Sequence, residues 1–202
     1  MVDETEIPES VHEHAHHHDG FRRLAAVYVG MVAMLLAISS LGGGKATKEM
    51  LGASIRASDT YSFAQAKYLR QTAYELAADQ IEAQLTAYLS IPDDAKASMT
   101  ALIARYRAAA ARYASDPTSG EGRRELIATA KNWEAVRDHA EVQDPNFQFA
   151  QALFQIAIVL ASVAIAAHSF ALLGLSATSA TFATAMMING YFLLVPLPWF
   201  GS

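Results

Sequence analysis

Five histidines near the N-terminus are the residues with the clearest potential for chemistry. They are His12, His14, His16, His17 and His18, and they lie among acidic residues. Imidazole is the commonest protein ligand for metal ions. His12 and His16 are four residues apart, as are His14 and His18, so a short helix would present two pairs of imidazoles, as zinc-binding helices do. We therefore predict either loose capture of Zn, Ni or Cu or a solvated polar tail. The tail is favoured because no third ligand is visible.

Three glutamines enter an otherwise apolar segment on one helical face. Gln148, Gln151 and Gln155 are spaced i, i+3 and i+7. An amide without a partner in hydrocarbon costs on the order of a few kcal/mol, so this face is predicted to contact protein. It could line a path for a solute or a proton, but hydrogen bonding between helices is the simpler interpretation. His168 and Asn189 are the other polar groups of this region. An ionisable residue inside a membrane is a functional candidate, but His168 is expected near the opposite surface, and for it we favour a structural role.

A polar block on a later helix is the third candidate. It consists of Asp59, Gln65, Lys67, Arg70 and Glu75. Surface ion pairs at such spacings contribute about 0–1 kcal/mol, so a solvated face that packs or binds a partner is expected. Since no nucleophile has an adjacent base and no strand precedes a glycine-rich phosphate loop, we predict that the protein is not an enzyme.

The charges of the 202-residue chain are strongly segregated. Residues 45–144 contain fourteen acidic and thirteen basic residues, whereas 24–44 and 145–202 contain none. A nearly balanced middle excludes nucleic-acid binding, which needs a clustered positive excess. The chain has no cysteine, which excludes disulfides, thiolate catalysis and Cys-ligated zinc.

The elements that must position these residues include three apolar segments. A charge at the centre of a bilayer costs about 2.5–3.5 kcal/mol, so uncharged segments of this length predict membrane spans, at 22–43, 149–173 and 177–196. A cleaved secretory signal is the alternative for the first segment, but the acidic residues before it and the lack of an Ala-x-Ala site favour an uncleaved anchor. Residues 1–21 are predicted to be a disordered tail, and the three glycines 42–44 a flexible exit from the bilayer.

The middle, residues 44–146, is predicted to be a helical hairpin or three-helix bundle with coiled-coil character. Strong helix formers predict a helix over 45–89, followed by helices over 94–114 and 123–143. A new helix, nearly continuous with the preceding one, is predicted to begin at Asp144-Pro145. Seven-residue spacings connect Leu69 with Leu76 and Tyr74 with Ile81, and these residues with Leu85 predict an apolar stripe that must pack on something.

Two passages resemble a bacterial family of unknown function, the DUF4337 family. The first passage is Leu41-Gly-Gly-Gly-Lys-Ala-Thr47 with Ala57-Ser-Asp59, Gln65-Ala-Lys67, Arg70-Gln71, Tyr74 and Glu75, and the second is Gln155-Ile-Ala-Ile-Val-Leu-Ala-Ser162. His-rich acidic N-termini are also similar. The resemblance implies the three-span layout and a bacterial inner membrane, and it supplies no active residues. Where the family leads us to expect basic residues between the last two helices, this chain has only His168.

We therefore expect an all-α integral membrane protein with three transmembrane helices and a long helical domain between the first two. Its function is predicted to be that of a non-enzymatic accessory subunit or self-assembling oligomer, in contact with lipid and with copies of itself or a larger membrane complex. The alternative is a metal-responsive or solute-conducting oligomer. Two bases lie on each side of the first span, Arg22 and Arg23 before it and Lys45 and Lys48 after it. The N-terminus is predicted to be cytoplasmic because the short N-terminal tail is the segment that the positive-inside rule governs better. The predicted interaction surface comprises Lys67, Arg70, Tyr74, Ile81, Leu85, Gln148, Gln151 and Gln155, and no cofactor is expected beyond loosely bound Zn, Ni or Cu.

Overall fold

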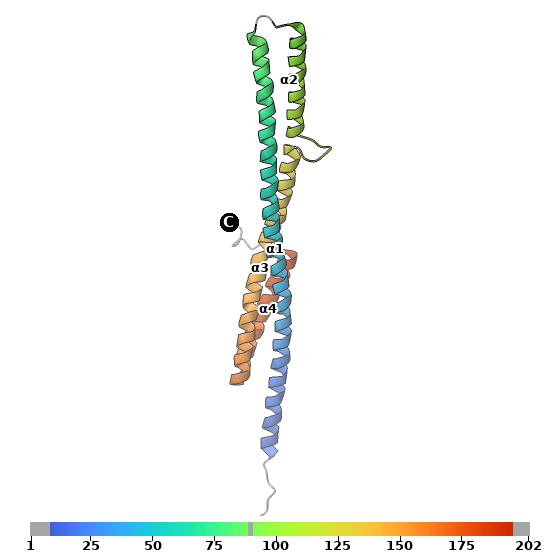
Figure 1. The fold of residues 1–202 in the computed structure, drawn as a ribbon. Coiled ribbons are helices and arrows are strands. Elements are labelled where there is room, and N and C mark those ends of the chain that lie inside the picture. Colours follow the sequence, from blue (N-terminus) through green and yellow to red (C-terminus); the bar gives the residue numbers. More distant parts are fainter. Residues whose placement is uncertain (1–8, 89–90, 196–202) are drawn as a thin grey trace, which may run out of the picture. The chain divides into compact units, whose positions relative to one another are not determined.

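Four helices make up the part of the chain that the structure describes. A computed structural model describes residues 9–88 and 91–195, with side chains from Gly20 onward. The helices are α1 (Glu9–Ala87), α2 (Asp93–Ala114), α3 (Arg123–Ala167) and α4 (Phe170–Phe192), shown in Figure 1. The described residues contain no strand, so the all-α prediction is confirmed.

Helix α1 is longer and less interrupted than the sequence suggested. It begins at Glu9, so residues 9–21 are helical rather than disordered, and residues 1–8 lie outside the described part of the chain. Extending an existing helix is far cheaper than nucleating a new one, which explains why the polar residues continue α1. The helix also passes through Gly42–Gly44, which were predicted to be a flexible exit.

Helix α3 is likewise continuous where a new helix was predicted. Pro145 lies inside it. Proline lacks an N–H and removes one helical hydrogen bond. The side chain of Asn146 donates to the carbonyl oxygen of Val142 at 2.9 Å, so a side chain bonds to the helix backbone close to the missing donor. The predicted boundary at Asp144-Pro145 is therefore wrong, because local side-chain bonding and packing outweigh the tendency of proline to end a helix.

The chain divides into two compact units. Unit 1 comprises residues 1–48 and 139–202, and unit 2 comprises residues 49–138. Both α1 and α3 contribute to each unit, whereas α4 belongs to unit 1 and α2 to unit 2.

Unit 1 is a bundle of three helices around a core of small and aromatic side chains. Phe147 and Phe154 of α3 are the largest fully buried side chains of this core, and Val32 of α1 and Met187 of α4 pack with them. The remaining core positions of α3 and α4 are mostly alanines, which allow helix backbones to approach closely. These alanines are Ala150, Ala157, Ala180 and Ala183.

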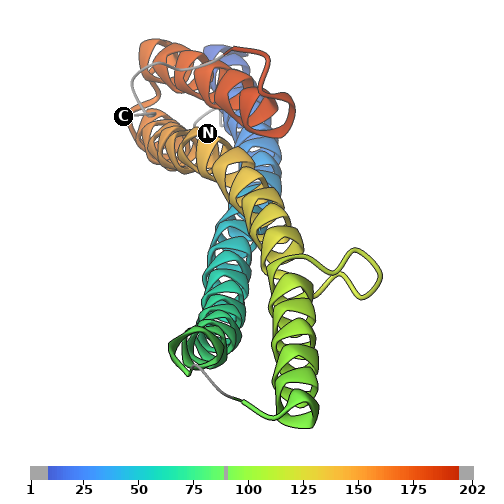
Figure 2. The same ribbon diagram turned by 90° about the horizontal axis from the view of Figure 1, so that it is seen from above.

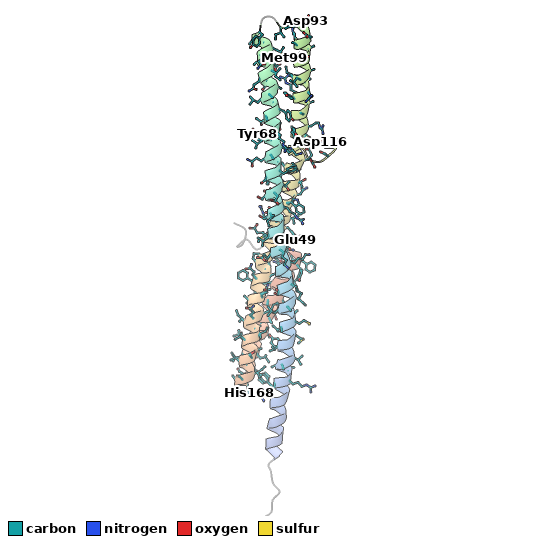
Figure 3. The ribbon with its side chains drawn as sticks, in the orientation of Figure 1. Glu49, Tyr68, Asp93, Met99, Asp116 and His168 are labelled. Atoms are coloured by element: carbon teal, nitrogen blue, oxygen red, sulfur yellow. The ribbon has the colours of Figure 1, made fainter. Side chains whose placement is uncertain are left out.

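Aromatic contacts define one end of unit 1, which we call the first contact layer. The ring of Phe21 on α1 meets the ring of Phe170 edge-on, with centroids 4.6 Å apart. The ring of His168 lies 6.4 Å from that of Phe21. Figure 3 labels His168 at this end. The part of α1 around Phe21, the end of α3 and the start of α4 therefore lie together.

A second contact layer defines the other end. The buried ring of Phe147 meets the ring of Tyr191 on α4 edge-on, with centroids 4.8 Å apart, and it lies against Gly42 of α1 and Gly190 of α4. Along α1, 21 residues separate Phe21 of the first layer from Gly42 of the second. Phe147 of α3 and His168, directly after the end of α3, have the same separation, as have Phe170 and Tyr191 on α4. At 1.5 Å per residue, each helix covers about 32 Å between the layers.

The boundary between the last two helices differs from the prediction. They were expected at 149–173 and 177–196, with a turn at Gly174–Ser176. The turn instead lies at His168, whose φ of 50° is left-handed, and at Ser169, whose hydroxyl accepts from the N–H of Leu172 at the start of α4. Ser176 is fully buried inside α4 and donates to the carbonyl oxygen of Ala157 at 2.6 Å. The Gly-Leu-Ser passage is thus helical and not a turn, and its serine is a packing contact between helices.

Three of the described helices are long and apolar enough to cross a membrane. They are the portion of α1 from Gly20 onward, α3 and α4. This agrees with the number of spans that the sequence predicts.

Unit 2 is a helical hairpin, one of the two arrangements predicted. Along α1 in this unit, from its N-terminal to its C-terminal part, the helix packs against one partner helix at a time, first α3 and then α2. The contacts that show this order are Arg56–Trp133, Tyr61–Glu134, Tyr68–Arg123, Tyr74–Tyr113 and Glu82–Arg107. Figure 2 shows the connection between α2 and α3 projecting beside these helices.

Candidate interaction surfaces

The apolar stripe predicted on α1 divides into two faces in unit 2. Tyr74 stacks on Tyr113 of α2, with ring centroids 5.6 Å apart, and also contacts Tyr106. Ile81 and Leu85 are half-buried on the same face of α1. These three residues of the predicted interaction surface therefore lie toward the inside of the hairpin, where α2 covers them.

The opposite face of α1 is exposed over its whole length in unit 2. We call it the α1 seam. It has small side chains alternating with leucines, and the leucines Leu69 and Leu76 are 61% and 58% exposed. The other members of the seam are Ser62, Ala66, Ala73, Gln80 and Ala83, all of which are exposed.

A cleft on unit 2 brings together the polar residues of the predicted surface. It has a volume of about 340 Å³ and is lined by Lys67, Arg70 and Tyr74 of α1, together with residues of α2 and the following connection. The ammonium of Lys67 pairs with the carboxylate of Glu121 at 3.2 Å. Arg70 is exposed at the rim. The solvated-face prediction thus holds for Arg70, whereas Lys67 is a half-buried link to the connection.

The connection between α2 and α3 is organised by the carboxylate of Glu125. It accepts from the hydroxyl of Ser115 at 2.6 Å and from the backbone N–H of Asp116 at 3.1 Å. The Ser115 hydrogen bond is the main reason that the pKa of Glu125 lies below its ordinary value. The pKa of Asp116, labelled in Figure 3, is also lowered, chiefly by a hydrogen bond from Ser119. A Cβ at Gly122 would overlap the backbone of Ser115 and Asp116, so this turn requires glycine.

The three glutamines of α3 do not share one environment. Gln148 is exposed and donates to the carboxylate of Asp144. Gln151 is half-buried, with its amide against Gly43 of α1. Gln155 is exposed, and no hydrogen-bond partner for it is found among the described residues. Within one copy of the chain, the prediction that this face contacts protein therefore holds only for Gln151.

A buried polar network beside the second contact layer was only partly visible in the sequence. The amide of Asn189 donates to the side-chain oxygen of Asn146 at 2.8 Å, and both residues are buried. The side chain of Asn189 also accepts from the N–H of Val195 at 2.8 Å and donates to its carbonyl oxygen at 3.0 Å. Asn189 therefore connects α3 with the residues that follow α4. Asn146 was missed because nothing in its sequence context distinguishes it from a surface residue beside a proline.

The histidine cluster lies outside the described side chains. Loose binding of Zn, Ni or Cu by His12 to His18 therefore stays a prediction. Among the side chains that the structure describes, no group of three His, Cys, Asp or Glu residues could hold a metal ion.

Comparison with known proteins agrees with the resemblance found in the sequence. Neither a curated protein nor a solved structure is matched by the chain. A family model described as a domain of unknown function (DUF4337) matches residues 8–193, which include all four helices. The chain therefore belongs to the DUF4337 family.

Proposed function

We propose that this protein is a non-enzymatic, membrane-anchored helical protein that assembles with a second copy of itself through the α1 seam. In this proposal, the three apolar helices cross the bacterial inner membrane and anchor unit 2. The spacing of about 32 Å between the contact layers supports it, because the hydrocarbon core of a bilayer is about 30 Å thick. The N-terminus is placed in the cytoplasm.

The exposed seam is the observation that carries this proposal. Its members follow a heptad pattern in which Ala66, Ala73 and Gln80 occupy a positions and Leu69 and Leu76 occupy d positions. Apolar residues at a and d positions pack as knobs into holes on a partner helix. Since α2 and α3 cover the other face of α1, the seam is free to receive that partner.

A second copy of the chain is the partner whose chemistry fits best. Two copies anchored in one membrane present their seams in parallel at high local concentration, and Leu at d positions suits parallel dimers. The flanking e and g positions pair Arg70 with Gln65 and Asp79 with Gln84 between copies, so no like charges oppose each other. The polar Gln80 at an a position would fix the register.

The exposed amide of Gln155 is an independent reason to expect a partner. It lies eight residues along α3 from Phe147, about 12 Å from the second contact layer toward the first. In the proposed topology this position is within hydrocarbon, where a glutamine gains about 0.6–2 kcal/mol by hydrogen bonding to another helix. The corresponding residue of a second copy could supply that bond.

Disulfide cross-linking tests the proposal. The natural chain has no cysteine, so every disulfide between copies must come from the introduced residue. The variants Leu69→Cys and Leu76→Cys are made separately in the full-length protein and oxidised in native membranes. Both should yield covalent dimers on a non-reducing gel. Glu75→Cys, which is exposed at a c position of α1, outside the a, d, e and g positions of the seam, is the matched control and should yield far less dimer.

Two outcomes would contradict the proposal. Equal cross-linking of Leu69→Cys and Glu75→Cys would indicate random collision. Absence of dimer from both seam variants, with the thiols accessible to maleimide, would show that the seam is free in the membrane. Recovery of the chain in the soluble fraction would overturn the anchoring itself.

A further inference from the structure

An apolar groove runs along unit 1 between α1 and α4, near the first contact layer. It has a volume of about 580 Å³ and is lined by Leu24, Val27 and Met31 of α1 and by Leu173 of α4, among others. Gly20 and Ala177 also line it. Their lack of larger side chains leaves the groove open, and a Cβ built on Gly20 would meet nothing within 4 Å.

The floor of the groove offers no free polar group. Tyr28 is part of the lining, but its hydroxyl is 2.9 Å from the hydroxyl of Ser176 and is hydrogen-bonded to it. Ser176 in turn donates to the backbone of α3. An occupant therefore meets hydrocarbon along the walls, where Leu24, Val27 and Met31 are more than half exposed.

One end of the groove carries a single positive charge, that of Arg23. Arg23 lines the groove and is exposed, and no carboxylate pairs with it among the described side chains. The only acids of unit 1 with described side chains are Glu141 and Asp144. Asp144 lies 23 residues from the end of α3, about 35 Å along the helix from the first contact layer. Neither of these two described acids can therefore reach Arg23.

We propose that this groove binds one acyl chain of an anionic phospholipid whose phosphate pairs with the guanidinium of Arg23. The inference rests on the membrane location proposed above. Guanidinium is the side-chain group best suited to bidentate bonding with phosphate, and basic sites between membrane helices bind anionic headgroups. From Leu24 to Met31 the apolar walls extend about 10 Å along α1, enough for the first part of an acyl chain. A zwitterionic lipid carries a cation in its own headgroup, so its phosphate would gain less binding energy from pairing with Arg23.

Lipid retention by the full-length protein tests the site. The protein is reconstituted in vesicles of equal phosphatidylglycerol and phosphatidylcholine, extracted in mild detergent and analysed by native mass spectrometry. The natural protein should retain phosphatidylglycerol about fivefold over phosphatidylcholine, the preference expected from one basic residue near the headgroups. Arg23→Gln should abolish this preference. Ala177→Leu, which fills the groove but keeps the charge, should reduce retention of both lipids.

Arg22→Gln is the matched control. Arg22 is exposed and adjacent in sequence but does not line the groove, so this variant loses the same charge and should keep the preference. Equal retention of the two lipids by the natural protein would overturn the inference. An equal loss in Arg22→Gln and Arg23→Gln would also overturn it, because that result requires only a diffuse surface charge. Failure of the protein to enter the vesicles would instead count against the proposed membrane location, and cysteine cross-linking measures seam pairing separately.

Discussion

Phe147 shows how single residues determine the packing of unit 1. Its ring is 2% exposed and lies between a glycine of α1, Gly42, and a glycine of α4, Gly190. A Cβ at Gly42 would stand 2.6 Å from Cε1 of Phe147 and 2.7 Å from the hydroxyl oxygen of Tyr191. That hydroxyl donates to the carbonyl oxygen of Ile38 at 3.2 Å, so it is not free to move without cost.

We therefore predict that Gly42→Ala destabilises the protein by about 1–3 kcal/mol through overpacking. Gly44→Ala is the control, because a Cβ there meets nothing within 4 Å. It should be neutral or stabilising by about 0.5–1 kcal/mol, since alanine is the better helix former. Unfolding in mixed micelles of increasing SDS content, followed by far-UV circular dichroism, measures both. Equal stability of the two variants would contradict the close approach at Gly42.

The same glycines mark a limit of prediction from sequence at the residue scale. Gly42–Gly44 were assigned as a flexible exit because glycine lowers helix propensity, but whether a glycine is a break or a contact depends on what lies opposite. Here Phe147 is opposite, more than a hundred residues away in the chain. A similar ambiguity affected α1, where Leu69 and Tyr74 both begin seven-residue series. Only the position of α2 decides which series is covered.

At the scale of elements, the connection between α2 and α3 should make unit 2 sensitive to acid. The folded-state pKa of Glu125 is below its ordinary value of 4.5. A lowered pKa means that the ionised carboxylate favours the folded state above pH 4.5, and this contribution is lost as the pH falls through the folded-state pKa. Glu125→Gln should therefore lower thermal stability at pH 7 and flatten its decline below pH 4.5.

Circular-dichroism melts of the full-length variants between pH 7 and pH 3 check this prediction. Glu49→Gln, which removes an exposed carboxylate of α1, should leave the pH dependence of stability unchanged. Some acid sensitivity should remain in Glu125→Gln, because the pKa of Asp116 is lowered in the same connection. An unchanged pH profile in Glu125→Gln would contradict the role assigned to its hydrogen bonds.

The helices themselves were largely predictable, whereas their ends were not. The sequence indicated α2 almost to the residue, because Ile91-Pro92 and the following aspartates are local signals. The end of α3 at Ala167 was missed, because nothing in the sequence marks the left-handed conformation of His168 and because Ser169, although a favourable N-cap residue, lies within an uncharged apolar segment. Pro145 led to the opposite error, because a helix boundary was predicted there and α3 continues through it.

At the scale of the whole molecule, the proposed topology predicts the sides of the membrane from which residues can be labelled. Three crossings place residues 20 and 119 on opposite sides, and residues 119 and 195 on the same side. Single-cysteine variants Gly20→Cys, Ser119→Cys and Val195→Cys are treated with a membrane-impermeant maleimide on intact spheroplasts. Ser119→Cys and Val195→Cys should react, and Gly20→Cys should react only after lysis. The opposite pattern would reverse the orientation, and uniform labelling would contradict three spans.

The equal spacing of the two contact layers has a consequence for the membranes that suit this protein. Each of the three helices has the same length between the layers, and mutual packing prevents one from tilting alone. Hydrophobic mismatch costs fractions of a kcal/mol per Å for a helix, and here the three penalties must add. If the three helices cross the bilayer as proposed, we therefore expect unit 1 to accumulate in membranes whose hydrocarbon thickness matches its span and to be sorted away from thinner or thicker ones.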